Sequence, residues 1–336
     1  MTTSEQAVAA LRVQRATLPS RIGLGVGLVA VVVLALGPLW ALDSVLRTLI
    51  SFLTLLALAQ MWNLLAGYAG LVSIGQQAYV GLGAYGLLLF ADTLGLPVAA
   101  SVLAAAVAGT LIAVPTALLA FRLRGGYFAI GTWVIAEVYR LVVTNVSQLG
   151  GGSGLTLRAA STVDRTTRLY LTYELALVVG VGAVVATYLL LRRRLGLALT
   201  AIRDGEQSAQ SLGVPVFRTK FAVYLVAAFG CSLAGAVIYL NLLRVQPEAA
   251  FSVNWTAFMI FIVVIGGVGT IEGPIIGTIV FFALQETLSG YGAWYLVLLG
   301  AVAVLVTVVA RRGLWGLIAE RTGWSLFPVQ RRLEER

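Results

Sequence analysis

Long apolar stretches alternate with short polar or charged stretches along almost the whole chain. A helix rises about 1.5 Å per residue and the bilayer core is about 30 Å thick, so apolar runs near twenty residues predict membrane-spanning helices. Outer-membrane barrels would instead show segments of about ten residues with alternating polarity. The sequence therefore predicts an all-α, polytopic inner-membrane protein. Its ten expected spans cover residues 22–41, 44–65, 70–91, 97–121, 127–145, 171–191, 221–241, 255–269, 273–289 and 293–310.

The basic residues are distributed unevenly over the loops between these spans. With both termini on one side, 17 of the 23 Lys and Arg residues fall on that side. Cytoplasmic loops carry such an excess, so both termini are expected in the cytoplasm. The distribution also explains the net charge of +9 as a topology signal rather than a nucleic-acid-binding face. The remaining six are Arg47, Arg140, Arg158, Arg165, Arg168 and Arg244.

Three parts follow from this topology. Residues 1–21 form a cytoplasmic N-terminal tail, residues 22–310 the transmembrane domain, and residues 311–336 a cytoplasmic C-terminal tail. The first apolar run lacks a clear small-x-small cleavage site, so we interpret it as an uncleaved span rather than a signal peptide. Trp, Leu and Ile residues lie among Arg residues after Gly313, which favours an amphipathic segment at the headgroup layer over a disordered tail.

Composition removes most enzyme classes. The chain is 60% hydrophobic and 11% charged, whereas soluble domains are nearer 45–50% and 25%. It contains no His and only one Cys, Cys231, so triad catalysis and clustered metal ligands are not expected. Its only Lys, Lys220, follows Thr219 and precedes Phe221, which does not fit a phosphate-binding Walker A loop. We expect no catalytic residues, no metal and no cofactor in this chain.

A short helix is expected inside the cytoplasmic loop 192–220. Asp204 is a plausible N-cap, Gly213 a C-terminal stop, and Pro215 prevents continuation. Ala209 and Leu212 give this helix small apolar contacts, which suit insertion into a groove of a cytosolic partner. The alternative is an ordinary amphipathic connector.

The sequence of this loop resembles that of a known family. The run from Ala201 to Gly213 reads Ala-Ile-Arg-Asp-Gly-Glu-x-x-Ala-x-x-x-Gly. It is similar to the coupling-loop signature of branched-chain amino acid ABC transporter permeases. The segments 73–85 and 266–277 resemble the early and late membrane motifs of that family. Segments 122–130 and 151–156 fit the longer of its two permease subunits.

The resemblance implies an importer in the bacterial inner membrane. Its expected partners are a second permease subunit, two cytosolic ATP-binding subunits that hydrolyse ATP, and an extracytoplasmic solute-binding protein. The implied substrates are branched-chain amino acids, with urea, short amides or other small amino acids as alternatives. The resemblance places ATPase coupling at five residues: Arg203, Asp204, Glu206, Ala209 and Gly213.

Placing a polar side chain within a membrane span costs free energy, so each such residue requires a structural or functional explanation. Asn63, Ser73, Gln76 and Gln77 lie where Gly residues interrupt the helical pattern. They either line a translocation path or form hydrogen bonds between helices. Glu137 and Arg140 are three residues apart, so they share a helix face and can pair. We favour a structural pair over a substrate-carboxylate site.

Glycines are concentrated in one late segment. Their spacing allows close backbone approach between helices, and the proline there suits a first helical turn. Tight packing or subunit contact is the simpler interpretation, and a gating hinge is the alternative. The chain can also dip into the membrane and return here. The residues are Gly266, Gly267, Gly269, Gly273, Pro274 and Gly277.

Two other classes compete with the importer. An ion-coupled secondary transporter predicts carboxylates around a midplane site, and Glu137 is the only clear intramembrane candidate. A membrane scaffold leaves the short cytoplasmic helix unexplained. Co-purification of ATP-binding subunits separates the importer from both.

Overall fold

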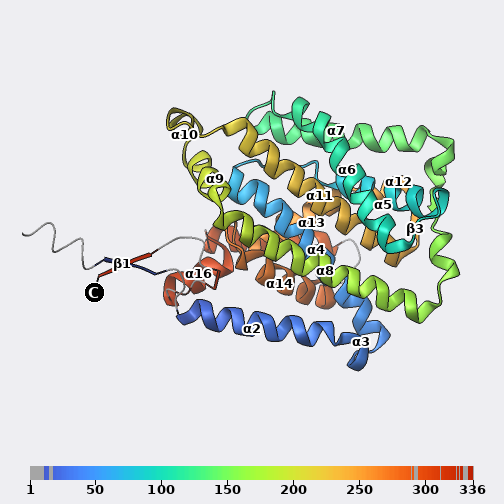
Figure 1. Cartoon of the computed structure of the whole chain (residues 1–336), viewed down its shortest axis with the longest axis horizontal. Helices are drawn as coiled ribbons and strands as arrows, with labels where there is room; N and C mark the ends of the chain where they lie inside the picture. The colour runs from blue at the N-terminus through green and yellow to red at the C-terminus, as the bar shows by residue number, and fades with distance from the viewer. Residues whose placement is uncertain are drawn as a thin grey trace, which may run out of the picture.

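Long antiparallel helices form the molecule, as the computed structural model shows for residues 11–14, 18–288, 290, 294–310, 312–322, 324, 326–327 and 332–335 (Figure 1). Successive long helices run back and forth between two ends of the bundle. The long helices are α2 (Leu18–Ala35), α4 (Asp43–Asn63), α5 (Gln77–Leu88), α6 (Val98–Ala120), α7 (Gly126–Asn145), α8 (Arg165–Arg192), α11 (Val216–Leu242), α13 (Val253–Gly266), α14 (Glu272–Leu288) and α15 (Trp294–Val309).

Shorter elements cap the bundle at either end. The α10 end carries α9 (Arg194–Asp204), α10 (Glu206–Ser211) and α16 (Gly313–Thr322). The β3 end carries β2 (Leu155–Thr156), which pairs antiparallel with β3 (Arg244–Val245). The remaining elements are β1 (Leu11–Gln14) paired with β4 (Arg332–Glu335), helices α3 (Gly37–Trp40) and α12 (Pro247–Ala250), π-helical η1 (Leu64–Tyr68) and η2 (Leu89–Thr93), and the 3₁₀ turns η3 (Ser147–Leu149), η4 (Gly151–Ser153) and η5 (Ala159–Thr162).

Seven helical segments of the described chain are long and apolar enough to cross a membrane. The structure therefore confirms an all-α, multi-span membrane protein. The count of ten spans, the tail and domain boundaries and the cytoplasmic termini remain predictions. The seven segments are Asp43–Tyr68, Val98–Ala120, Gly126–Asn145, Arg165–Arg192, Val216–Leu242, Pro247–Gly266 and Val297–Thr322.

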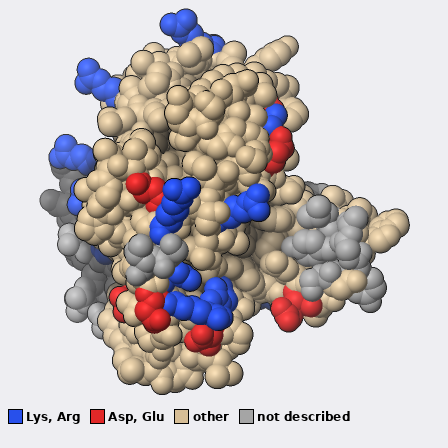
Figure 2. All heavy atoms as spheres, turned by 90° about the vertical axis from the view of Figure 1, so that its right-hand side faces the viewer, with Lys and Arg blue, Asp and Glu red and all other residues tan. Residues whose placement is uncertain are grey.

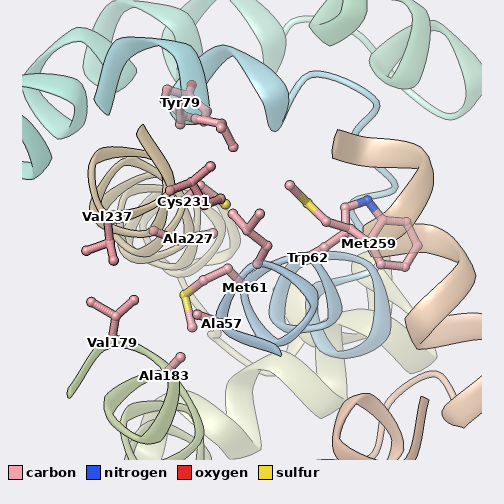
Figure 3. Packing of buried hydrophobic residues seen from close by; sticks show 14 of the residues in the cluster. Ala57, Met61, Trp62, Tyr79, Val179, Ala183, Ala227, Cys231, Val237 and Met259 are labelled. Atoms are coloured by element: carbon pink, nitrogen blue, oxygen red, sulfur yellow. The ribbon is translucent and has the colours of Figure 1, made fainter. Parts of the chain in front are cut away.

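Burial identifies the centre of the bundle. In the most apolar window of Asp43–Tyr68, 78% of residues are buried, against 22% for Gly126–Asn145. Figure 3 shows α4 residues Met61 and Trp62 packed among side chains from α5, α8, α11 and α13. Helix α4 therefore lies at the centre of the bundle. Helix α7 lies at its periphery, where most of its surface can contact lipid or another subunit.

The expected span 70–91 is helical only from Gln77 onward. Gly70 has φ of +67°, a conformation that favours glycine, and residues 70–76 form no helix. A Cβ on Gly75 would lie 2.3 Å from the carbonyl oxygen of Thr132. Only glycine allows this close approach to α7, and the break in the helix falls where the glycines predicted an interruption.

Candidate functional site

The loop that resembles a coupling loop folds as two consecutive helices, α9 and α10. Asp204 is the last residue of α9, and Gly205 occupies the N-cap position of α10, with φ of 179° and ψ of 106°. The prediction of Asp204 as the N-cap is therefore wrong, because helix α9 continues through this residue. Gly213 has φ of +82° and follows the end of α10, as the stop signal predicted.

The side chains of α10 divide into exposed and buried sets. Leu212 is 81% exposed, whereas Ala209 is 1% exposed. The expectation that Ala209 faces outward is corrected, because it packs inside the chain. The Glu206 carboxylate accepts a hydrogen bond from Lys220 Nζ at 2.7 Å, which ties α10 to the first turns of α11. Leu212 is thus the apolar side chain that this helix offers to another molecule.

Arg203 connects the loop to the transmembrane helices. Its Nη1 donates to the carbonyl oxygen of Gly67 at 3.2 Å, in the π-helical turn that ends α4. Its Nε also lies 3.5 Å from Asp204 Oδ1. π-helical turns inside helices are often found at functional sites. A movement of α9 would therefore reach the end of α4 through this contact.

The end of α4 in turn holds the turn between α13 and α14. Asn63 Nδ2 donates to the carbonyl oxygen of Thr270, and Asn63 Oδ1 accepts from the Gly269 amide, both at 2.8 Å. Gln60 Nε2 donates to the Ile271 carbonyl oxygen at 2.8 Å. Three consecutive backbone groups of this turn are thus bound by side chains of one helix. Arg203, η1 and the turn form one continuous contact chain.

The glycine-rich segment packs α13 against α14 as a hairpin that turns at the α10 end. A Cβ on Gly266 would lie 1.8 Å from the Gly273 carbonyl oxygen, and one on Gly277 would lie 1.9 Å from that of Ile262. Gly267 and Gly269 have positive φ, at 136° and 77°. Pro274 lies in the first turn of α14, as expected. The geometry supports the packing interpretation of this segment.

The remaining polar residues of the early motif lie in the core. Ser73, Gln76 and Gln77 are at most 1% exposed. Ser73 Oγ accepts from the Gly75 amide at 3.2 Å, and its carbonyl oxygen accepts from the Trp62 indole at 2.8 Å. Gln77 Oε1 accepts from the Thr256 hydroxyl. These contacts favour hydrogen bonding between helices over the alternative of a water-filled path.

Glu137 and Arg140 pair on α7, as their spacing indicated. Arg140 Nε donates to both Glu137 carboxylate oxygens, at 2.9 and 3.0 Å. Its Nη1 also forms an ion pair with Glu248 of α12, which the sequence reasoning missed. That partner lies 108 residues away, so no local spacing could reveal it. The arginine therefore links α7 to α12 at the β3 end.

Two further carboxylates hold loops in place. Glu272 is 6% exposed, and its Oε1 accepts from the Leu326 and Phe327 amides at 3.0 Å each. Asp92 accepts from the Arg158 and Ala159 amides at 2.9 and 2.7 Å. Their positions at helix ends were the only available signal, and no local pattern could reveal their partners. They fix the C-terminal segment and the long loop respectively.

The expected amphipathic segment forms helix α16. Trp315 is 7% exposed and packs inside, whereas Leu317 and Ile318 of the same helix are 37% and 41% exposed. Arg312, directly before this helix, forms an exposed ion pair with Glu320 at 2.8 Å. The two-faced distribution agrees with an amphipathic helix beside the membrane surface.

Comparison with known proteins gives the family. Over 284 residues the chain is 28% identical to the high-affinity branched-chain amino acid transport system permease protein LivM of Escherichia coli K12. That match covers 75% of this chain and 65% of the relative, so the chain spans just under two thirds of its length.

Sugar permeases match over shorter segments. The fructose import permease protein FruG of Bifidobacterium longum is 29% identical over 42% of this chain and 44% of its own. The ribose import permease protein RbsC of Escherichia coli K12 is 28% identical over 39% and 43%. Residues 44–307 match the family described as branched-chain amino acid transport system / permease component, and the chain belongs to that family.

Proposed function

We propose that the chain is the membrane permease subunit of an ATP-driven importer of branched-chain amino acids in the bacterial inner membrane. Its expected partners are a second permease, two cytosolic ATP-binding subunits that carry the ATP, and an extracytoplasmic solute-binding protein. The LivM match supports amino acids over sugars, because it covers 75% of the chain against about 40% for the sugar permeases.

The observation that carries the proposal is the contact between Arg203 and Gly67. The loop α9–α10 projects at one end of the bundle, where Leu212 is exposed for a partner (Figure 1). Arg203 then joins this loop to η1, and Asn63 joins η1 to the α13–α14 turn. A partner that moves α10 during ATP hydrolysis would thereby displace helices that cross the membrane.

The test is ATP-dependent uptake by the assembled complex. The chain is co-expressed with the second permease and ATP-binding subunits of its gene neighbourhood, reconstituted in proteoliposomes and supplied with the binding protein. Labelled leucine should enter only when ATP is present on the side of the membrane where the ATP-binding subunits lie. Uptake driven by an ion gradient by the chain alone would overturn the proposal, and uptake of urea or an amide without leucine would revise the substrate.

Coupling is tested separately from assembly. Gly213→Asp or Glu206→Arg should reduce uptake while membrane insertion and ATP hydrolysis persist. Leu212→Glu should weaken co-purification of the ATP-binding subunits, whereas the conservative Leu212→Met should retain it. Normal uptake by the first two variants, or unchanged co-purification for Leu212→Glu, would reject docking at α10.

A further inference from the structure

A cavity of about 540 Å³ lies at the α10 end, between α13, α15, α16 and the turn that joins α13 to α14. We call it the α16 cavity, because α16 contributes more residues to its lining than any other element. The volume lies within the range of about 300–1,000 Å³ that is usual for small-molecule sites. A Cβ on Gly313 would lie 2.4 Å from the Gly267 Cα, so the start of α16 packs directly against the glycine-rich turn. The cavity therefore has a fixed shape on this side.

The surroundings of the α16 cavity are those of the boundary between lipid tails and headgroups. The apolar side chains Val304, Leu305, Val308 and Val309 of α15 are each more than 60% exposed. Charged side chains lie at the ends of the bundle: Figure 2 looks onto the β3 end and shows them there, and α16 carries its own at the α10 end. Together with the two-faced α16, this distribution places the cavity at the level of the phospholipid headgroups.

The first turn of α16 brings backbone donors to the cavity, which Gly313, Trp315 and Gly316 line. Amides in the first turn of a helix have no partner within that helix and carry partial positive charge. The Gly313 amide donates to the Ala310 carbonyl oxygen at 2.7 Å, whereas no acceptor for the next two amides is found in the described part of the chain. A helix start of this kind favours an anion.

A buried indole supplies a second and independent donor. Trp315 lines the cavity and is only 7% exposed. The indole N–H groups of Trp40, Trp62 and Trp255 donate to carbonyl oxygens, but that of Trp315 makes none of the hydrogen bonds found among the described residues. Its nitrogen is not fully enclosed by protein either, so it faces open space, and the cavity is the space that this ring lines. An N–H in this position favours a ligand with an acceptor atom.

Two charged side chains complete the polar part of the lining. Arg312 is exposed and pairs through Nη1 with Glu320 at 2.8 Å. A guanidinium has five N–H donors in a planar fork, so Arg312 retains donors for a second anion, and phosphate suits this fork well. The Glu320 carboxylate beside it repels a doubly charged anion more than a singly charged one. This lining fits a phosphodiester, which has a single charge, better than free phosphate.

We propose that the α16 cavity binds a membrane phospholipid through its phosphodiester. The phosphate oxygens accept hydrogen bonds from the first turn of α16, the Trp315 indole and the Arg312 guanidinium. The acyl chains lie along the exposed apolar side of α15. Exposed apolar residues alone would suit another subunit equally well, but the three kinds of donor single out a lipid with a phosphate. Thr270 also lines the cavity, so the bound lipid connects α16 to the turn that Asn63 holds.

The test counts the lipids bound to the full-length chain, alone and in the assembled complex, by native mass spectrometry. The protein is purified in detergent, depleted of lipid and titrated with dioleoylphosphatidylglycerol. Dioleoylglycerol has the same acyl chains and no phosphate, so it is the matched control lipid. The phospholipid should bind about 10-fold more tightly than dioleoylglycerol and should raise the unfolding temperature. An equal concentration of inorganic phosphate or glycerol 3-phosphate should not displace it, because neither has acyl chains.

Variants of the cavity assign the donors. Arg312→Gln should weaken binding of the phospholipid about 10-fold, and Trp315→Phe, which keeps a ring and removes the N–H, about 3- to 10-fold. Neither should change the binding of dioleoylglycerol. Arg321→Gln and Trp324→Phe are the matched controls, because both side chains are exposed and lie outside the cavity. They should bind the phospholipid as the unmodified chain does.

Four results would overturn the inference. The first is equal binding of the two lipids, and the second is unchanged phospholipid binding in both cavity variants. The third is displacement by glycerol 3-phosphate, which would make the ligand a soluble phosphate ester. The fourth is phospholipid binding to the chain alone but not to the complex, which would make the cavity a subunit interface. The comparison of lipids needs no variant, so a variant that fails to fold leaves the test intact.

Discussion

The two ends of α4 carry polar residues in opposite situations. At the α10 end, Asn63 is fully buried and bonded to the turn between α13 and α14. At the β3 end, Arg47 borders a cavity and forms none of the ion pairs found among the described residues. A polar group whose hydrogen bonds are all made inside the chain stabilises the fold. A polar group that faces an open cavity has hydrogen-bonding capacity left for water or another molecule.

The largest loss of stability is expected from a substitution where α13 and α14 are in contact. Gly266→Ala places a Cβ 1.8 Å from the Gly273 carbonyl oxygen, a distance that only backbone displacement can relieve. Overpacking of this kind costs about 1–3 kcal/mol, and more where backbone must move. We expect little monodisperse protein in detergent by size-exclusion chromatography.

Gly182→Ala is the matched control, because it introduces the same methyl group in α8 with nothing within 4 Å. It should behave like the unmodified chain. Equal yields for the two variants would show that the hairpin is not closely packed and would revive the hinge interpretation.

A smaller loss of stability is expected at the buried end of α4. Asn63→Leu removes both hydrogen bonds to the turn and leaves the Gly269 amide and the Thr270 carbonyl without this partner. Unsatisfied buried groups cost about 1–3 kcal/mol. The unfolding temperature of the purified protein should fall.

The comparison variant for Asn63 lies at the other end of the same helix. Thr48→Val changes an exposed side chain beside the cavity, so its unfolding temperature should stay close to that of the unmodified chain. If the unfolding temperature fell further for Thr48→Val than for Asn63→Leu, the conclusion that the polar residues at the α10 end stabilise the fold would be wrong.

The same two ends show what the sequence could predict. Apolar runs placed the helices, because hydrophobic length is a local property of the chain. The bonds of Asn63 to Gly269 span 206 residues, and those of Arg140 to Glu248 span 108, so tertiary packing decides them. The N-cap at Gly205 was missed because continuation of α9 through Asp204 overrode a local capping preference. The cavity beside Arg47 was not foreseen, since it exists only where four helices meet.

A modest loss of stability is expected when the Arg140 ion pairs are removed. Arg140→Gln removes the cation that joins Glu137 to Glu248, whose side chains are 45% and 79% exposed. Exposed pairs contribute about 0–1 kcal/mol, so the unfolding temperature should fall slightly while leucine uptake persists. Lost uptake by a folded, assembled complex would instead support the substrate-carboxylate alternative for this pair.

The smallest effect on stability is expected at the Lys220–Glu206 pair. A variant of this pair therefore distinguishes a role of α10 in coupling from a role in folding. The Glu206 side chain is 58% exposed and solvent weakens the attraction, so Lys220→Gln should cost no more than about 1 kcal/mol. Because this contact orients α10 against α11, the ratio of leucine uptake to ATP hydrolysis should fall by more than the unfolding temperature indicates. Lys220→Arg retains the positive charge and should restore that ratio, whereas an unchanged ratio in Lys220→Gln would show that α10 needs no tie to α11.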